Sequence, residues 1–235
     1  MKWKSKLIED TDWTGSITNA EGKQAVASEI SARARDGETI GAGSGSTSLL
    51  ALIAIAKRVK HEHLKIKIIP TSIEIMMACS KLGLPMASML TERPDWLFDG
   101  ADEVDPDHNL IKGRGGAMFK EKLLIRASAK NFILIDQTKI VKRLGEKFPI
   151  PVEIYPASMT YVEAELSRLG VTELTLRSAK GKDGPVITET GNLILDAYFK
   201  EIHIDLEKQI KLITGVIESG LFMNYPIEVL VAPSP

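Results

Sequence analysis

The sequence predicts an α/β protein with a Rossmann-like domain built on a parallel sheet and a second, smaller α+β domain. Two observations support this prediction. Up to Pro149, short apolar segments typical of strands alternate with segments typical of helices, and the strands read as continuous apolar runs. Such runs are typical of parallel strands that are covered on both faces. After Pro149 the order changes to strand, helix, strand, strand, helix, strand, which is that of a ferredoxin-like split unit.

Each element of the first domain is predicted from its own pattern. Thr71 and Glu74 have the spacing of a capping box, and Gly37 and Gly83 are typical helix ends. The predicted strands cover residues 38–43, 64–70, 95–99 and 131–136. The predicted helices cover residues 20–37, 46–60, 71–83, 116–130 and 137–145.

The second domain is predicted over residues 150–222. Its strands are expected at residues 151–156, 171–178, 191–199 and 216–222, and its helices at 158–170 and 205–215. A last apolar strand, "IEVLVAP", is expected to return to the first sheet. We therefore divide the chain into an N-terminal extension (1–19), a Rossmann-like catalytic domain (20–149, with the C-terminal strand in 223–235) and the small domain.

Composition excludes several classes of protein. The chain has 235 residues, of which 44% are hydrophobic and 26% charged, and its net charge is −1. This balance gives no reason to expect nucleic acid or an acidic membrane as a partner. No apolar run approaches the ~20 residues of a membrane span, and the start of the chain lacks the apolar core of a signal peptide. With a single cysteine, no internal disulfide can form, so we expect a cytoplasmic protein.

The glycine-rich segment "GAGSGST" lies between a predicted strand and a predicted helix. Glycines permit close backbone approach to a phosphate, and a helix N-terminus offers free N–H groups to an anion. Ser44, Ser46 and Thr47 add hydroxyl donors. A dinucleotide fingerprint fits poorly, because Ser46 stands where its third glycine belongs, and no G-K-[ST] of a P-loop is present. A glycine turn that binds no ligand remains the alternative.

Two further runs place charge next to glycine. Asp99 ends the apolar strand "WLF", and Asp102 follows it closely. Because ligands of parallel sheets bind at the carboxyl ends of strands, these aspartates stand where chemistry is usual. Lys112 begins the run "KGRGG", whose glycines could bring its ammonium and several N–H groups to an anion. The alternatives are ordinary strand-end aspartates and a mobile surface loop.

Glu121 is the most informative residue. At roughly 100° per residue, a helix starting near Ala117 places Glu121 on its apolar arc, which also holds Leu124 and Ala129. Lys122, Arg126 and Lys130 fall on the opposite side. Burying a carboxylate is costly and raises its pKa toward the range of a general base. The alternative is an edge carboxylate paired with a lysine.

The histidines and the cysteine point away from metal or thiol chemistry. His61, His63, His108 and His203 show no spacing typical of ligands. Cys79 lies beside Met76 and Met77 and is better explained as a core residue than as a nucleophile.

These motifs together resemble the type A ribose-5-phosphate isomerase family. The matching segments follow the family order and cover nearly everything after residue 19. They are "GSGST", "TSIE…LGLP", "FDGADEVD", "LIKGRGGAMFKEK", "DQTKIVKRLGEKFPIPVEI", "TETGNLILD" and "GVIESGLF". A set of seven is far more specific than any single motif.

The resemblance implies a function and a set of site residues. The family interconverts ribose 5-phosphate and ribulose 5-phosphate in the pentose phosphate pathway, without metal or cofactor. Glu121 matches the proton acceptor, with Asp99 and Lys112 as further catalytic candidates. The expected substrate contacts are Lys23, Ser44, Gly45, Ser46, Thr47, Asp99, Gly100, Ala101, Asp102, Lys112, Gly113, Arg114, Gly115 and Lys139. The expected partner is a small sugar phosphate, and the expected assembly is a homodimer or homotetramer.

The assigned residues suit the chemistry. An aldose–ketose isomerisation moves one proton between adjacent carbons through an enediolate, which a single carboxylate such as Glu121 can do. Lys112 and the amides of its loop suit the developing oxyanion, and Asp99 suits the ring opening and the proton transfer between O1 and O2. Asp102 suits sugar hydroxyls or the orientation of Lys112.

Two positions depart from the family pattern. Ser44 stands where the family usually has threonine, and Arg114 stands where it usually has glycine. Arg114 therefore keeps open an isomerase of a different phosphorylated sugar. A phosphosugar sensor without enzymatic activity and a transferase acting on coenzyme A thioesters also stay open as functions.

Overall fold

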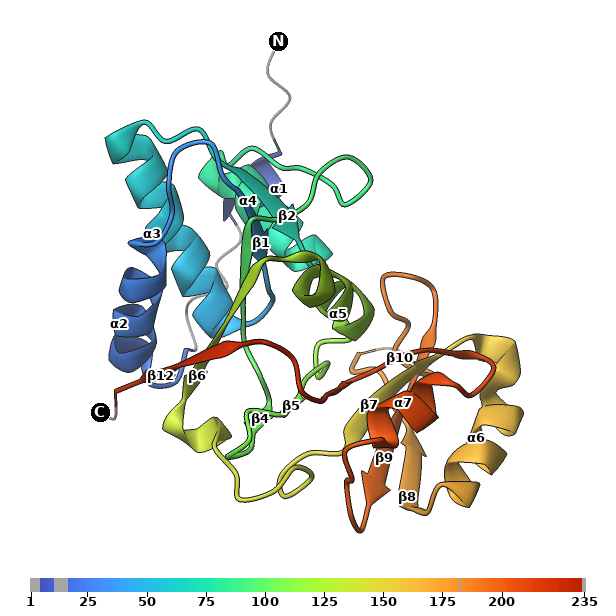
Figure 1. Ribbon diagram of the computed structural model, residues 1–235. Helices are drawn as coiled ribbons and strands as arrows, with labels where there is room; N and C mark the ends of the chain where they lie inside the picture. Colours follow the sequence, from blue (N-terminus) through green and yellow to red (C-terminus); the bar gives the residue numbers. More distant parts are fainter. Residues whose placement is uncertain (1–4, 11–16, 182, 234–235) are drawn as a thin grey trace. The chain divides into compact units, whose positions relative to one another are not determined.

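The computed structural model describes residues 5–10, 17–181 and 183–233. The chain forms two compact units, which are described one at a time (Figure 1). The first unit comprises Met1–Gly100, Leu123–Gln137 and Pro226–Pro235. The second comprises Ala101–Lys122 and Thr138–Tyr225.

A five-stranded parallel sheet forms the centre of the first unit. Its strands are β1 (Thr39–Ala42), β2 (Lys67–Pro70), β3 (Trp96–Asp99), β6 (Lys130–Asp136) and β12 (Glu228–Ala232). Their order is β12-β6-β3-β1-β2, and every neighbouring pair is parallel. The chain therefore leaves β1 toward β2 and then returns to the other side of β1. This confirms the predicted parallel sheet, including the return of the C-terminal strand, and creates a topological switch point between β1 and β3.

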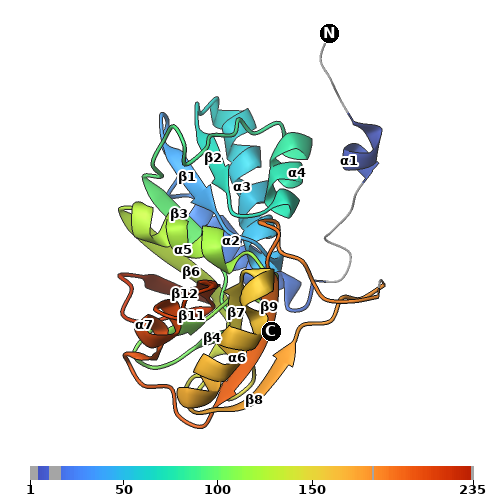
Figure 2. The same cartoon turned by 90° about the vertical axis from the view of Figure 1, so that its right-hand side faces the viewer.

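Helices flank this sheet (Figure 2). They are α2 (Ala20–Ser31), α3 (Ser46–Glu62), α4 (Ile73–Leu82) and α5 (Met118–Ala127), of which α5 continues from the second unit into the first. The short helix α1 (Lys6–Asp10) contacts α4. Three details correct the sequence prediction. Helix α2 ends at Ser31 rather than Gly37, α4 is capped by Ser72 rather than Thr71, and α1 is helical within the predicted extension. The rest of residues 1–16 lies outside the described residues, apart from Ser5.

The core of the first unit explains why these strands read as continuous apolar runs. All four residues of β1 and of β3 are buried. The largest fully buried side chains near them include Phe98, Ile40, Ile68 and Leu52. Since both faces of the sheet are covered, strand alternation is absent from the sequence.

The second unit contains the predicted βαββαβ order (Figure 1). Its elements are β7 (Ile150–Ile154), α6 (Met159–Arg168), β8 (Val171–Leu176), β9 (Leu193–Phe199), α7 (Leu206–Lys211) and β10 (Val216–Ser219). The sheet order is β10-β7-β9-β8, with every neighbouring pair antiparallel. This is the arrangement of a ferredoxin-like split unit and confirms the predicted second fold.

A small antiparallel sheet in the second unit was not predicted. It joins β4 (Glu103–Val104), β5 (Leu110–Ile111) and β11 (Leu221–Phe222) in the order β11-β5-β4. Two-residue strands carry too little pattern to be read from sequence. Because β11 lies over 100 residues after β5, this pairing places residues 101–122 in the second unit. The boundary predicted at residue 149 placed them in the first domain, so the structure divides the chain elsewhere.

The helix predicted at residues 137–145 is also wrong. The chain forms only a short 3₁₀ turn, Gln137–Lys139. The next backbone amides find tertiary partners: those of Gly145, Lys147 and Phe148 donate to the buried Glu103 carboxylate at 2.6–2.8 Å. Val141 donates to the Val104 carbonyl at 3.0 Å. These bonds replace the helical ladder that the local sequence favours.

None of the helices in the described ranges is both long and apolar enough to cross a membrane.

Candidate active site

The glycine loop lies at the switch point of the parallel sheet. It joins the end of β1 to the start of α3, and the Gly43 amide donates to the Phe98 carbonyl of β3 at 2.8 Å. A Cβ at Gly43 would overlap the Asp99 carboxylate, so only glycine fits there. Gly45 has φ 95° and caps α3 without a side chain, in a region that favours glycine. The loop is therefore shaped for close approach of a ligand to backbone amides.

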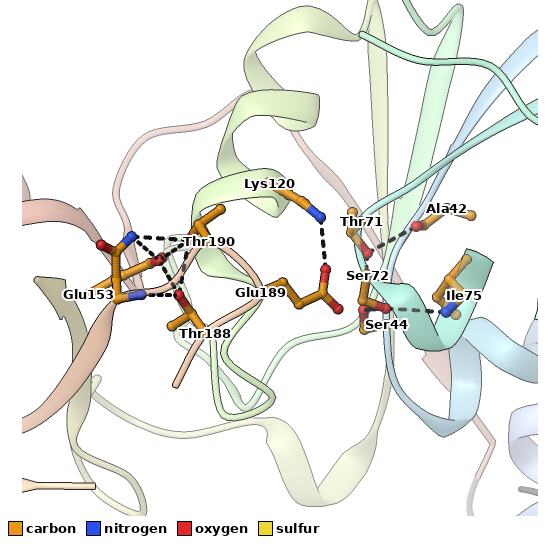
Figure 3. Close-up of polar contacts among 11 residues, drawn as sticks. Ala42, Ser44, Thr71, Ser72, Ile75, Lys120, Glu153, Thr188, Glu189 and Thr190 are labelled. Atoms are coloured by element: carbon orange, nitrogen blue, oxygen red, sulfur yellow. Dashed lines mark hydrogen bonds and ion pairs between the residues drawn. The ribbon is translucent and has the colours of Figure 1, made fainter. Parts of the chain in front are cut away.

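Ser44 is held by hydroxyl groups that follow the neighbouring strand β2. Its Oγ lies 3.0 Å from Thr71 Oγ1 and 2.8 Å from Ser72 Oγ (Figure 3). Ser72 Oγ also accepts from the Ile75 amide at 3.3 Å, and Thr71 Oγ1 donates to the Ala42 carbonyl at 3.0 Å. Thr71 and Ser72 open the segment "TSIE" of the sequence but were not predicted as site residues. Their signal is that they follow β2 just as Ser44 follows β1, at the same edge of the sheet.

Lys23 reaches the same loop from α2. Its buried Nζ lies 3.3 Å from Ser46 Oγ, 3.3 Å from Thr18 Oγ1 and 3.6 Å from the Asp136 carboxylate. The structure thus brings the expected basic contact to the glycine loop. Asp136 was missed, although it ends the apolar strand β6 as Asp99 ends β3. An aspartate at the carboxyl end of a buried strand was the available signal.

The run 99–102 divides between the two units. Asp99 is fully buried in the first unit, and its Oδ1 accepts from the Gly100 amide at 2.7 Å. Ala101 and Asp102 belong to the second unit. There the Asp102 amide donates to the Ile111 carbonyl at 2.8 Å, and its Oδ2 accepts from the Arg114 amide at 3.2 Å. Asp102 therefore orients the backbone of the loop that begins at Lys112.

Lys112 and Glu121 form a buried ion pair in the second unit. Lys112 Nζ lies 3.4 Å from Glu121 Oε2, and the two residues are only 3% and 5% exposed. Gly113, with φ 94°, and a turn from the Gly113 carbonyl to the Gly116 amide (3.0 Å) lead the chain from Lys112 into α5. The predicted burial of Glu121 is confirmed. A carboxylate and an ammonium removed from water interact far more strongly than a surface pair.

The position of Lys122 differs from the side of helix α5 predicted for it. It was expected on the solvent side of α5 but is 2% exposed, while Leu123 faces solvent. Lys122 Nζ lies 2.8 Å from Glu207, 3.0 Å from Glu218 and 2.7 Å from the Leu221 carbonyl. The exposed Ala129, placed on the apolar arc, is a second error. Segments distant in sequence cover this side of the helix, which the periodicity of one helix cannot reveal.

The pKa of Glu218 is shifted by burial and by the ion pair that its carboxylate forms with Lys122. Burial raises the pKa of its carboxyl, but the Lys122 charge and the Ser219 amide outweigh burial and hold the pKa below its usual value. Lys122 is therefore a structural cation whose charge is balanced locally.

The loop 113–115 is fixed from the small domain. Arg177 donates from Nη1 to the carbonyls of Gly113 (3.1 Å) and Arg114 (2.9 Å), and its Nε lies 2.8 Å from Asp196. The Arg114 guanidinium lies 5.5 Å from the centre of the Phe148 ring. These contacts hold the loop at the backbone and leave Gly115 exposed.

Lys139 lies in the same neighbourhood as Arg114. Its Nζ is 5.7 Å from the centre of the Phe148 ring. A cavity of about 420 Å³ adjoins this region; its lining is Asp102, Arg114, Phe148, Pro149, Pro151, Arg177, Ser178, Lys180, Val186 and Asp196. The second unit thus contains Asp102, Lys112, Arg114, Glu121 and Lys139 among the residues expected from sequence.

The motif "TETGNLILD" has a structural explanation. Thr188 and Thr190 donate to the buried carboxylate of Glu153 on β7, at 2.7 and 2.5 Å (Figure 3). The side-chain amide of Asn192 donates to the same carboxylate at 2.9 Å. Beside them Lys120 pairs with Glu189 at 2.7 Å. The motif therefore satisfies a buried charge and fixes the turn before β9.

Cys79 is buried in the core, and burial raises the pKa of its thiol to about 12. A thiol that is protonated at neutral pH is a poor nucleophile. Within the described ranges, no group of three or more histidine, cysteine, aspartate or glutamate side chains is arranged to hold a metal ion.

The fold and these residues define the class of protein. A doubly wound sheet carries a glycine loop and an aspartate at its switch point, and the second unit carries a buried carboxylate–lysine pair. Such a set suits an α/β enzyme that binds an anionic ligand and transfers a proton.

Comparison with known proteins identifies the family. Residues 67–234 match the family model of ribose 5-phosphate isomerase A (phosphoriboisomerase A). A ribose-5-phosphate isomerase A of Prochlorococcus marinus is 42% identical over 89% of this chain and 90% of its own length. That of Methanothermobacter thermautotrophicus is 40% identical over 80% of this chain and 83% of its own. The chain belongs to the ribose 5-phosphate isomerase A family.

Solved structures agree with this assignment. Ribose 5-phosphate isomerase A from Methanocaldococcus jannaschii matches with a TM-score of 0.88 and 39% identity, over 92% of this chain and 96% of that one. A D-ribose-5-phosphate isomerase in complex with phospho-erythronic acid matches with a TM-score of 0.87 and 35% identity, again over 92% and 96%. The predicted fold class is thereby confirmed.

Proposed function

We propose that this protein interconverts D-ribose 5-phosphate and D-ribulose 5-phosphate through an enediolate. The observation that carries the proposal is the buried pair of Glu121 and Lys112, 3.4 Å apart, in a chain of this family. Phospho-erythronic acid, bound by a relative, has a carboxylate next to a hydroxyl-bearing carbon and so resembles an enediolate in charge and shape.

Glu121 is the base. The Glu121 carboxylate takes the proton from C2 of ribose 5-phosphate. The electrons of that C–H bond form the C1–C2 double bond, and the carbonyl oxygen on C1 becomes negative. The same carboxyl then returns the proton to C1, which leaves a ketone at C2. Its position in the first turn of a helix and its burial both support this assignment.

Lys112 stabilises the charge that develops on oxygen. An ammonium that is already fixed in a dry site needs little reorganisation when the oxyanion forms. The amides of Gly113 and Gly115 follow within three residues of Lys112 and can add donors. Asp99 opens the sugar ring and moves the proton between O1 and O2, and Asp102, Gly100 and Ala101 contact the hydroxyls.

The phosphate group of the substrate is bound by Ser44, Gly45, Ser46 and Thr47 at the start of α3. A helix N-terminus with hydroxyl donors suits an anion, and Lys23 lies 3.3 Å from Ser46. Lys139 is a further basic contact. Because the phosphate is remote from the reacting carbons, its binding energy serves to position them.

One assay tests the proposal. The purified chain, treated with excess chelator and dialysed, is mixed with ribose 5-phosphate, and ketose formation is followed over time. We expect turnover that chelator does not abolish. If no ketose forms while another sugar phosphate or a coenzyme A thioester is consumed, the proposal is wrong. Activity lost in chelator and restored by a divalent ion would contradict the metal-free mechanism.

We also propose that the enzyme works in the cytoplasm as a homodimer or homotetramer. The family resemblance supports the assembly, and a single buried cysteine suits a reducing compartment. Light scattering at micromolar concentration measures the assembly directly; a monomer would contradict this part of the proposal.

A further inference from the structure

The segment Glu218–Phe222, "ESGLF", belongs to a family motif, yet the proposed mechanism gives it no role. It contains the end of β10 and all of β11. Its residues are buried, and three of its contacts lead to the Lys112–Glu121 pair or to the residue next to it. We call these five residues the 218–222 segment.

The first contact holds the backbone of Lys112. The Lys112 amide donates to the Gly220 carbonyl at 2.8 Å, and the Gly220 amide donates to the Pro151 carbonyl at 2.6 Å. A Cβ at Gly220 would overlap the Lys112 carbonyl oxygen and would lie 2.7 Å from Pro151 Cδ. Glycine is thus required here by close packing, and the position of Lys112 depends on it.

The second contact holds the first turn of α5. Lys122, the neighbour of Glu121, places its ammonium 3.0 Å from Glu218 and 2.7 Å from the Leu221 carbonyl. The Glu207 carboxylate lies 2.8 Å from the same ammonium. A buried ammonium with two carboxylates and a carbonyl is fixed firmly, since leaving any of these charges unpaired is costly.

The third contact is the Phe222 ring. Its centre lies 5.9 Å from Lys112 Nζ and 4.6 Å from Lys122 Nζ. An ammonium within about 6 Å of a ring face is attracted by its quadrupole. Tyr225 packs against the ring at 5.6 Å between centres, and its hydroxyl donates to Glu207 at 2.8 Å. One side chain therefore contacts both lysines.

We propose that the 218–222 segment is a positioning device that holds Lys112 and Glu121 at the separation that proton transfer needs. Gly220 fixes Lys112 through the backbone, Glu218 and Leu221 fix the helix of Glu121 through Lys122, and Phe222 links the two. The inference rests on the proposed function and deepens it by naming positioning residues that do not touch the substrate.

The segment acts on the rate of the chemical step rather than on substrate binding. Glu121 must reach two adjacent carbons in turn while Lys112 faces the oxyanion, and a displacement of about 1 Å at such a site can cost ~10²-fold in rate. The phosphate contacts at Ser44–Thr47 are made by other residues. A disturbance of the segment should therefore lower kcat and leave KM nearly unchanged.

Phe222→Leu is the main test, because it removes the ring but keeps an apolar side chain. We expect kcat for ribose 5-phosphate to fall about 10-fold or more, with KM within twofold of wild type. Gly220→Ala is the second variant and displaces Lys112 directly; we expect a fall of about 10²-fold in kcat. Thermal melting establishes the folded fraction, and kcat is expressed per folded molecule.

Lys211→Met is the matched control. Lys211 pairs with the same Glu218 carboxylate at 3.3 Å but is half exposed. This variant should keep kcat and KM within twofold of wild type. A loss equal to that of Phe222→Leu would show that any change around Glu218 impairs the enzyme, and would overturn the proposal.

The other outcomes distinguish an error in this inference from an error in the proposed function. If wild type turns over and the folded variants keep its kcat, the 218–222 segment is only structural and the inference is wrong. If neither Phe222→Leu nor Gly220→Ala folds, Phe222→Met decides, since methionine keeps more of the apolar volume of the side chain while removing the ring. A folded wild type that does not convert ribose 5-phosphate overturns the proposed function and this inference with it.

Discussion

The glycine loop of the first unit and the Lys112–Glu121 region of the second unit are both rich in glycine but use different chemistry. Around Ser44 the contacts are hydroxyl to hydroxyl, at 2.8–3.0 Å, beside backbone amides and a helix start. Around Glu121 they are contacts between buried full charges. Several neutral hydrogen-bond donors are enough to bind an anion. Proton transfer also needs a charged base and a nearby countercharge in a site that excludes water. The first region therefore suits binding, and the second suits catalysis.

The largest effect is expected from removing the charge of Glu121. Glu121→Gln keeps the size of the side chain but removes the base, so we expect kcat to fall by ~10²–10⁴-fold or more with little change in KM. Steady-state kinetics with ribose 5-phosphate measure both. Glu146→Gln makes the same change at an exposed carboxylate of the second unit and should leave kcat unaltered. A Glu121→Gln enzyme that keeps more than about a tenth of wild-type kcat would show that another group is the base.

The next effect tests the shape of the glycine loop. In Gly43→Ala the new methyl group meets the Asp99 carboxylate, so the loop and Asp99 both shift. We expect kcat/KM to fall about 10–100-fold and binding of inorganic phosphate, measured by calorimetry, to weaken in parallel. Gly170→Ala, at a turn with φ 88° and open space around the Cβ position, costs backbone strain without a clash and should leave phosphate binding unaltered. Unchanged phosphate binding in a folded Gly43→Ala protein would place the phosphate elsewhere.

A smaller effect is expected on stability, where the contacts of the Glu218 carboxylate depend on pH and the hydroxyl contacts of Ser44 do not. The pKa of Glu218 is lowered in the folded state, chiefly by Lys122 against the effect of burial. Its contribution to the free energy of unfolding is therefore present above the usual carboxyl pKa, ~4.3, and is lost as pH falls through the lowered value. We expect Glu218→Gln to be less stable than wild type at pH 7, with a smaller difference near pH 3.

Urea unfolding at the two pH values measures this difference. Ser44→Ala is the neutral counterpart from the first region, because its hydroxyl does not titrate; its stability difference should be the same at both pH values. A Glu218→Gln difference that does not shrink in acid would mean that the ion pairs contribute little to folding.

The smallest effect is expected at Arg114, where the family usually has glycine. The guanidinium lies over Phe148 and the loop is held through its backbone by Arg177. We therefore expect Arg114→Gly to change kcat/KM for ribose 5-phosphate by less than about threefold, under ~0.7 kcal/mol. A clear gain in ribose 5-phosphate turnover, with loss of turnover for another sugar phosphate, would instead assign Arg114 to substrate selection.

Much of the fold could be predicted because its signals are local. Continuous apolar strands predicted the parallel sheet, and the order of segments after Pro149 predicted the ferredoxin-like sheet. The errors fall where tertiary contacts override local preference. Residues 137–145 favour a helix by composition, but the Gly145 amide and that of the following Lys147 donate to Glu103, which lies over 40 residues earlier. The strands β4, β5 and β11 are too short to leave any pattern.

The candidate site divides in the same way. The burial of Glu121 follows from its place among apolar residues on one helix, and the glycine loop follows from a strand–glycine–helix order; the sequence alone determined both. Only the tertiary structure decided that Lys122 is buried, that Asp136 lies beside Lys23 and that Gly220 supports Lys112. The physical reason is distance along the chain. Periodicity reports which face of an element is apolar, but the partner of a buried charge comes from whichever distant segment folds over it.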